Sequence, residues 1–140
     1  MFVRTVGPKN AKIMLVGEAP GEQEDGKTLD ILLSQAGISR MECLVANVAR
    51  ERPPANKISH YFEDSKCTIP KPKLKEWLAL LKAEIIENKP NVIIALGNTA
   101  LWALTGEKKI SEFRGYVVPC SLAEGYKVLA TYHPQAVNRE

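Results

Sequence analysis

The stretch Ile13-Met14-Leu15-Val16-Gly17-Glu18-Ala19-Pro20-Gly21 decides the fold. Its four apolar residues in a row are typical of a strand buried on both faces of a parallel sheet. The glycine, carboxylate and proline that follow predict a turn that leaves the carboxyl end of this strand. A second segment of the same kind occurs late in the sequence, where the apolar run 127–132 leads into Tyr132-His133-Pro134. Because ligands bind at the carboxyl ends of strands in open α/β sheets, these two turns predict a site for a polar ligand at one sheet edge.

The rest of the chain alternates between apolar runs of strand length and longer segments with helical spacing. The clearest helix covers residues 73–88, because Leu74, Trp77, Leu81 and Ile85 recur on one face. Further strands are predicted at 43–48 and 92–96, helices at 28–36 and 98–104, and a hairpin around 116–118. This alternation predicts an α/β fold, a three-layer αβα sandwich with a central sheet of about four parallel strands.

Composition and charge fit a single cytoplasmic domain. The chain has 140 residues, 45% of them hydrophobic, which suits one domain spanning residues 1–140. Its three cysteines form no CxxC pair, so we expect reduced thiols with no disulfide framework and no metal site. No apolar run approaches the roughly 20 residues that span a bilayer, so we expect a soluble protein with no membrane partner. The sequence does not reveal the oligomeric state, for which a monomer is the working expectation. The net charge of +3 suits a polyanionic partner without requiring one.

Four polar turns should gather at the same edge of the predicted sheet, because each follows a parallel strand. They are residues 17–25, 47–57, 97–99 and 133–139. Their convergence is the basis of the functional interpretation.

Several motifs in these turns occur together in a fixed order. They are Gly-Glu-Ala-Pro-Gly at 17–21, Asn47 with Arg52-Pro53-Pro54, Ala-Leu-Gly-Asn-Thr-Ala at 95–100, Arg114-Gly115 and Tyr132-His133-Pro134. In this combination the chain resembles the uracil-DNA glycosylase superfamily over residues 12–139, and is most similar to family 4 and the phage DNA-polymerase-associated type.

The resemblance implies a role for the first motif at the scissile glycosidic bond. Gly17, Ala19, Pro20 and Gly21 would lie against the sugar and base, and Glu18 or Glu24 would orient or activate water. A carboxylate suits this work because the departing uracil leaves an oxocarbenium-like sugar that an anion stabilises. The alternative is that Glu18 only caps a turn.

Two further positions match residues that recognise uracil in the family. Asn47 would read the base edge, because an amide offers a donor and an acceptor that fit the O4 and N3-H of uracil and mismatch the amino group of cytosine. His133 would donate to uracil O2 and stabilise the leaving anion. Either residue could instead be structural, Asn47 as a turn former and His133 as a packed histidine.

Base access requires flipping the nucleotide out of the stack, so the surrounding loops should grip DNA. The resemblance implies uracil-containing DNA as the partner, and we expect single-stranded or mismatched DNA in particular because flipping costs least there. The usual serine after His-Pro is Gln135 here, which alters one phosphate contact. The candidate DNA-binding residues are Arg50, Arg52, Lys57, Gly97, Asn98, Thr99, Gln135 and Arg139.

The chain departs from the family in two places. Asp25 runs directly into Gly26, where members normally carry a Gly-x-Pro-Phe-x-Gly segment whose phenylalanine stacks on uracil, so only Tyr61 or Phe62 of the long loop could replace that ring. Family 4 also holds an iron–sulfur cluster on four cysteines, and two of the matching positions are Glu51 and the vicinity of Trp77. We therefore expect no cofactor and no metal.

Three functions remain open from the sequence. The first is excision of uracil from DNA in base excision repair, which the retained Glu18, Asn47 and His133 favour. The second is a degenerate glycosylase-fold module that binds DNA or a partner protein, which the missing phenylalanine segment favours. A flavodoxin-like nucleotide-binding domain rests on fold analogy alone, and no glycine-rich phosphate loop supports it.

Overall fold

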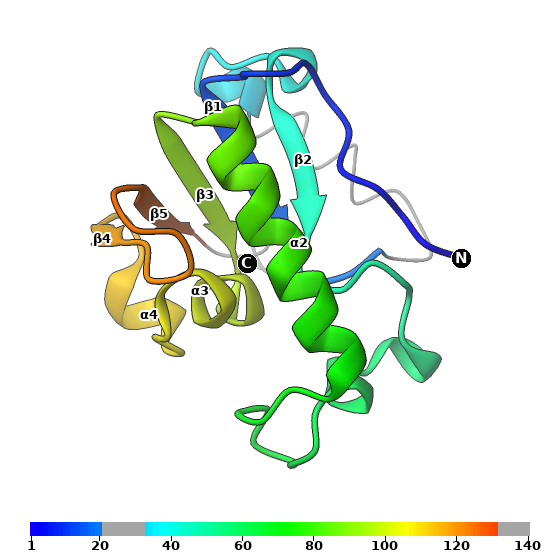
Figure 1. Cartoon of the computed structure of the whole chain (residues 1–140). Coiled ribbons are helices and arrows are strands. Elements are labelled where there is room, and N and C mark those ends of the chain that lie inside the picture. The colour runs from blue at the N-terminus through cyan, green and yellow to red at the C-terminus, as the bar shows by residue number, and fades with distance from the viewer. Residues whose placement is uncertain (21–32, 132–140) are drawn as a thin grey trace.

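One mixed, mostly parallel sheet organises the chain in the computed structural model, which describes residues 1–20 and 33–131 (Figure 1). Its five strands lie in the order β2-β1-β3-β5-β4, and the first four are parallel. β4 is an antiparallel edge strand, with Val118 opposite Val128 of β5. The strands are β1 (Ile13–Gly17), β2 (Leu44–Asn47), β3 (Val92–Leu96), β4 (Val117–Pro119) and β5 (Lys127–Thr131).

The two long helices of the described residues cover one face of this sheet. They are α2 (Pro72–Asn88) and α3 (Asn98–Thr105), and α2 crosses in front of the strands in Figure 1. Because strand side chains alternate between faces, Met14 and Ile93 belong to the large core cluster under these helices. Leu15 belongs instead to a smaller cluster on the opposite face, with the other members Leu33, Cys43 and Leu96.

The predicted elements agree closely with the structure. The helix predicted at 73–88 is α2, the strand predicted at 92–96 is β3, and the hairpin is formed by β4 and β5. The α/β fold and the four parallel strands are confirmed, and the antiparallel β4 adds a fifth strand. Most of the helix predicted at 28–36 lies outside the described residues.

The loop between β2 and α2 is ordered by short turns and buried aromatic rings. Tyr61 packs edge-to-face on Trp77 with centroids 4.9 Å apart, and Phe62 packs in the same way on Trp102 at 5.0 Å. The sequence showed no clear period here because single-turn helices carry none. These turns are η2 (Pro54–Asn56) and η3 (Ile58–Tyr61), and the remaining short helices are η1 (Arg40–Glu42) and α4 (Ile110–Phe113).

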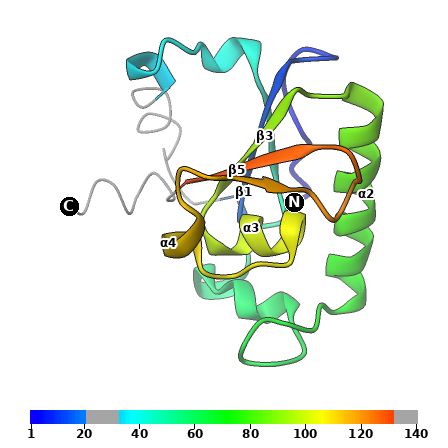
Figure 2. The same cartoon turned by 90° about the vertical axis from the view of Figure 1, so that its left-hand side faces the viewer.

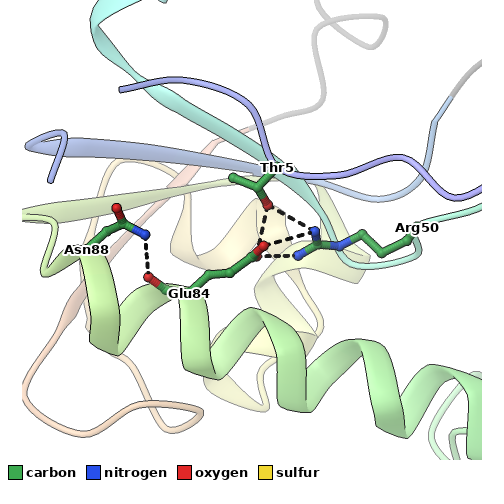
Figure 3. A network of polar contacts seen from close by, with 4 residues as sticks. All are labelled: Thr5, Arg50, Glu84 and Asn88. Atoms are coloured by element: carbon green, nitrogen blue, oxygen red, sulfur yellow. Dashed lines mark hydrogen bonds and ion pairs between the residues drawn. The ribbon is translucent and has the colours of Figure 1, made fainter. Parts of the chain in front are cut away.

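A polar network fastens the N-terminal segment to α2 (Figure 3). The Arg50 guanidinium donates to Glu84 Oε1 at 2.6 Å and to Thr5 Oγ1 at 2.9 Å, and the Thr5 hydroxyl donates to Glu84 Oε1 at 2.9 Å. One turn along α2, Asn88 accepts from the Asn10 backbone N–H at 3.0 Å. The segment is therefore held at two successive turns of α2.

This network corrects one prediction. Arg50 was expected to contact DNA phosphate, but its side chain is fully buried and forms an ion pair with Glu84. A buried guanidinium that is already paired cannot reach a phosphate without breaking a structural contact, so the prediction is wrong. The sequence misled because an arginine after a strand looks the same whether it turns inward or outward.

Among residues 1–20 and 33–131, no helix combines the length and the apolar content that crossing a bilayer requires.

Candidate active site

The carboxyl ends of the parallel strands meet at one edge, as the sequence predicted. Beyond the ends of β1 and β2, the Val48 and Ala49 N–H groups donate to the carbonyls of Gly17 and Glu18, each at 2.9 Å. At the ends of β3 and β5, the Gly97 N–H donates to the Thr131 carbonyl at 2.9 Å. The turn after β1 is thereby held beside the segment after β2, and the turn after β3 beside the end of β5 (Figure 2 gives the second view of this edge).

Gly17 allows Asn47 to lie directly against the end of β1. The two residues are partners in the parallel register of β1 and β2. A Cβ added to Gly17 would lie 2.7 Å from Asn47 Oδ1, closer than real Cβ contacts. The glycine of the Gly-Glu-Ala-Pro-Gly motif is thus required for the position of the asparagine amide.

Glu18 is held by a residue far away in the sequence. The Thr99 hydroxyl at the start of α3 donates to Glu18 Oε1 at 2.7 Å. Both side chains are half-buried. Gly97 adopts a positive φ of 95° just before α3, a conformation that glycine tolerates, and this turn brings Thr99 over the strand ends. The carboxylate is therefore fixed in direction before any ligand arrives, which is what a group that orients water needs.

Glu18 and Asn47 approach the end of β1 from different sides. Strand alternation places Asn47 on the same sheet face as Val45, whereas Glu18 is tied to α3 on the opposite face. Whether His133 completes a shared pocket stays a prediction, since it lies outside the described residues together with Gly21, Glu24, Gln135 and Arg139.

A cavity of about 220 Å³ opens beside Thr99. Cys67 is one of the residues that line it. Burial raises the pKa of the Cys67 thiol most, and the negative charges of Asp64 and Glu18 raise it further, whereas the positive charge of Lys108 lowers it. The cavity is therefore within electrostatic reach of the Glu18 carboxylate. It is lined by Phe62, Cys67, Asn98, Thr99, Trp102 and Lys108.

Comparison with known proteins then gives the family. The sequence profile of the Uracil DNA glycosylase superfamily matches residues 4–140. The chain belongs to this superfamily. It is 34% identical over 143 residues to the type-4 uracil-DNA glycosylase of Thermotoga maritima, covering 95% of this chain and 69% of that protein. The type-4 uracil-DNA glycosylases of Archaeoglobus fulgidus and Pyrobaculum aerophilum are 32% and 33% identical, over 97% and 96% of this chain and 71% of each relative.

The iron–sulfur cluster of family 4 does not fit the residues of this superfamily member. The chain has three cysteines, one fewer than the cage requires. Cys43 and Cys120 are buried, and the Cys43 thiol donates to the Ser39 carbonyl at 3.5 Å. In the described part of the chain, no three histidine, cysteine, aspartate or glutamate side chains are grouped so that they could hold a metal. That the protein carries no cofactor stays a prediction.

The remaining candidate DNA-binding residues differ in their exposure and hydrogen bonding. Arg52 and Lys57 are exposed on the loop after β2, and Arg52 Nε donates to Asn56 Oδ1 at 2.8 Å. The Asn98 amide oxygen accepts from the Ile110 N–H at 2.9 Å, so it caps α4. Sequence reasoning linked Thr99 to phosphate and missed its bond to Glu18. It also missed Trp102 and Lys108, although Trp102 is one helical turn after Asn98 and Thr99.

Proposed function

We propose that this chain hydrolyses the N-glycosidic bond of uracil in DNA. The observation that carries the proposal is the Glu18 carboxylate, fixed by Thr99 at the strand edge where Asn47 lies against Gly17. Membership of the uracil-DNA glycosylase superfamily supports it.

Glu18 is proposed to handle the attacking water, with Glu24 of the same motif as the alternative. As the C1′–N1 bond breaks, its electron pair leaves with uracil and positive charge develops on the sugar. A carboxylate fixed in direction stabilises that charge and accepts a proton as the water oxygen bonds to C1′. The Thr99 hydrogen bond at 2.7 Å leaves the second carboxylate oxygen of Glu18 for this task.

Asn47 and His133 are proposed to bind the base. The Asn47 amide donates to O4 and accepts from N3-H, a pattern that cytosine cannot match. His133 donates to O2, where negative charge accumulates only as the bond breaks. The donor in His133 therefore favours the transition state over the bound substrate.

The DNA strand is proposed to follow the same edge. Arg52 and Lys57 are exposed there and can pair with phosphates, with Arg139 and Gln135 of the final segment. The backbone at Gly97, Asn98 and Thr99 offers further N–H donors. Single-stranded or mismatched substrates are favoured, because unstacking the target base costs least there.

Incubation with a uracil-containing oligonucleotide tests this function, with alkali afterwards to cleave abasic sites. The expected result is cleavage only at uracil, lost in Glu18→Gln and made less selective for uracil over cytosine in Asn47→Asp. An oligonucleotide with thymine at the same position is the control. Failure of the parent protein to cleave any uracil substrate would refute the proposal.

A second candidate is a module that binds DNA without catalysis. The absent Gly-x-Pro-Phe-x-Gly segment favours it, and neither suggested substitute is a free ring, because Tyr61 and Phe62 are buried against tryptophans. Binding of uracil-containing DNA without any abasic product would establish this second function. Abasic product in the same assay would exclude it.

A further inference from the structure

The cavity beside Thr99 is distinct from the base-reading side of the proposed active site. It lies on the sheet face covered by α3, whereas Asn47 lies on the other face. Three segments enclose it: the loop before α2, the first turns of α3 and the link between α3 and α4. Its volume of about 220 Å³ is below the roughly 300–1,000 Å³ of sites for drug-sized ligands, and suits a single heterocyclic ring.

The walls combine aromatic surface with hydrogen-bonding groups. Phe62 and Trp102 meet edge-to-face with an interplanar angle of 63°, and Trp102 is half-buried, so part of its indole remains accessible. Thr99 and Lys108 add a hydroxyl and an ammonium group to the lining. A planar base edged with polar atoms matches this combination, because bases stack on aromatic rings whatever their sequence.

The loop that closes the cavity is already shaped without a ligand. The Lys108 ammonium donates to the Lys66 carbonyl and to the Cys67 carbonyl at 3.1 Å, which leaves its third N–H for an acceptor. Asp64 accepts from the backbone N–H groups of Thr68 and Ile69, each at 2.9 Å. A preformed site loses little entropy when it binds a ligand.

The charge of the lining favours an electron-rich ligand. Lys108 is its only ionised side chain, and none of the six lining residues is acidic. Asp64 and Glu18 both act on the Cys67 thiol, but Asp64 already accepts from the Thr68 and Ile69 N–H groups and Glu18 from the Thr99 hydroxyl. A cationic ligand is therefore disfavoured, whereas the carbonyl oxygens of a nucleobase are attracted.

We propose that this cavity binds the base of a nucleotide adjacent to the one whose glycosidic bond Glu18 faces. The proposal rests on the proposed function, since flipping one nucleotide unstacks its neighbour and leaves that base without a partner. Thr99 borders the cavity and contacts Glu18, so one side chain separates the two sites. The cavity then supplies a stacking surface next to the reacting nucleotide.

The fluorescence of Trp102 reports occupation of the cavity. The chain has two tryptophans, and Trp77 is 5% exposed and packs on Tyr61. In a Trp77→Phe variant excited at the red edge of the absorption band, where tyrosine does not absorb, only Trp102 emits. Its emission should be quenched by a single-stranded uracil-containing pentanucleotide, and not by the same strand with abasic tetrahydrofuran nucleotides on both sides of the uracil. Equal quenching by both strands would overturn the proposal.

Thiol labelling provides a second readout that is independent of catalysis. Cys67 is half-buried in the cavity wall, whereas Cys43 and Cys120 are buried. The pentanucleotide should slow the reaction of Cys67 with a disulfide reagent several-fold, and the strand with abasic neighbours should not. An unchanged rate with the pentanucleotide at saturation would contradict occupation.

Side-chain variants complete the test. Trp102→Leu should weaken pentanucleotide binding by about ten-fold, because it removes the stacking surface. Lys108→Ala should also weaken it, because it removes a hydrogen-bond donor from the lining. Lys109→Ala is the matched control, because that exposed lysine does not line the cavity, and its affinity should be unchanged. If Trp102→Leu fails to fold, the pentanucleotide affinity of Lys108→Ala, compared with that of Lys109→Ala, is sufficient to test the proposal.

The two proposals fail in different ways. Uracil excision that is unaffected by Lys108→Ala and Trp102→Leu, with no quenching or protection, would overturn the cavity proposal and leave the glycosylase function standing. Quenching and protection without excision would support base binding in the cavity and refute the catalytic function.

Discussion

Replacing Arg50 with methionine is expected to lower the free energy of unfolding by about 3 kcal/mol. The guanidinium is fully buried and donates to both Glu84 and Thr5, and its own backbone carbonyl accepts from the Val3 N–H at 2.6 Å. Methionine preserves most of the apolar stem but removes every side-chain donor. The Glu84 carboxylate then keeps only the Thr5 hydroxyl of this network as a donor.

The size of the effect follows from how far water reaches the pair. Removing one partner of a buried ion pair costs roughly 3–5 kcal/mol, because the other charge stays desolvated. The Glu84 side chain is 18% exposed, so part of its charge can be rehydrated and the lower end of that range applies. For a chain of this size, a loss of about 3 kcal/mol lowers Tm by roughly 12 °C. Arg50 Nε has no hydrogen-bond partner among the described residues, so the native pair is itself imperfect.

Urea denaturation with an unchanged m-value measures this loss. Adding Glu84→Leu to Arg50→Met should recover 1 kcal/mol or more, because the orphaned charge is removed. Lys73→Met is the control: its pair with Glu51 is exposed at 3.9 Å, and its loss should change stability by less than about 0.5 kcal/mol. A loss below 1 kcal/mol in Arg50→Met, or weaker DNA binding by its folded form, would refute the structural role assigned to Arg50.

Three further predictions concern chemistry, DNA binding and pH. His133→Ala should lower kcat for excision roughly 100-fold with little change in KM, because its donor acts on charge that forms only in the transition state. A rise in KM as large as the fall in kcat would argue against this role. Charge reversal at Arg52 and Arg139 should weaken binding of any DNA sequence alike and flatten its salt dependence, and salt-independent binding by the parent would contradict the basic edge. The hydroxyl and backbone hydrogen bonds to Asp64 lower its pKa from 3.8 to about 2, so their stabilisation is present above the ordinary pKa and is lost as pH falls through about 2. Amide NMR signals of that loop should hold steady to about pH 3, and a transition near pH 4 would show that the hydrogen bonds are absent.

The strands and the principal helix were predictable because burial on both faces leaves a clear signal in sequence. The apolar run of β3 and the one-sided pattern of α2 each follow from where their side chains must point. The antiparallel β4 was expected only as part of a hairpin, because three residues at an edge carry little periodicity. Arg50 shows the limit of this reasoning, because the partner that buries it lies 34 residues away.

In the candidate site, too, some features were predictable from strand positions and others depend on contacts between distant segments. Gly17 and Asn47 were singled out by their match to the family motifs, and their proximity was predictable because adjacent parallel strands end together. The contact between Glu18 and Thr99 depends on the turn at Gly97, and the cavity depends on how the loop before α2 packs on Trp102. These contacts join segments that are distant in sequence, so no spacing of residues within either segment predicts them.

Thr99 borders both proposed sites, so its variants can separate them. Thr99→Val keeps the shape of the cavity wall but removes the hydroxyl that donates to Glu18 at 2.7 Å. The freed carboxylate should sample other rotamers, so kcat for uracil excision should fall about ten-fold while quenching of Trp102 by the pentanucleotide persists. Thr99→Ser retains the donor and should restore kcat, which a purely steric role would not predict. Lys108→Ala should show the reverse pattern, weak quenching with kcat preserved at saturating substrate. If Thr99→Val instead abolished quenching and left kcat intact, the hydroxyl would serve the cavity, and its role in positioning Glu18 would be refuted.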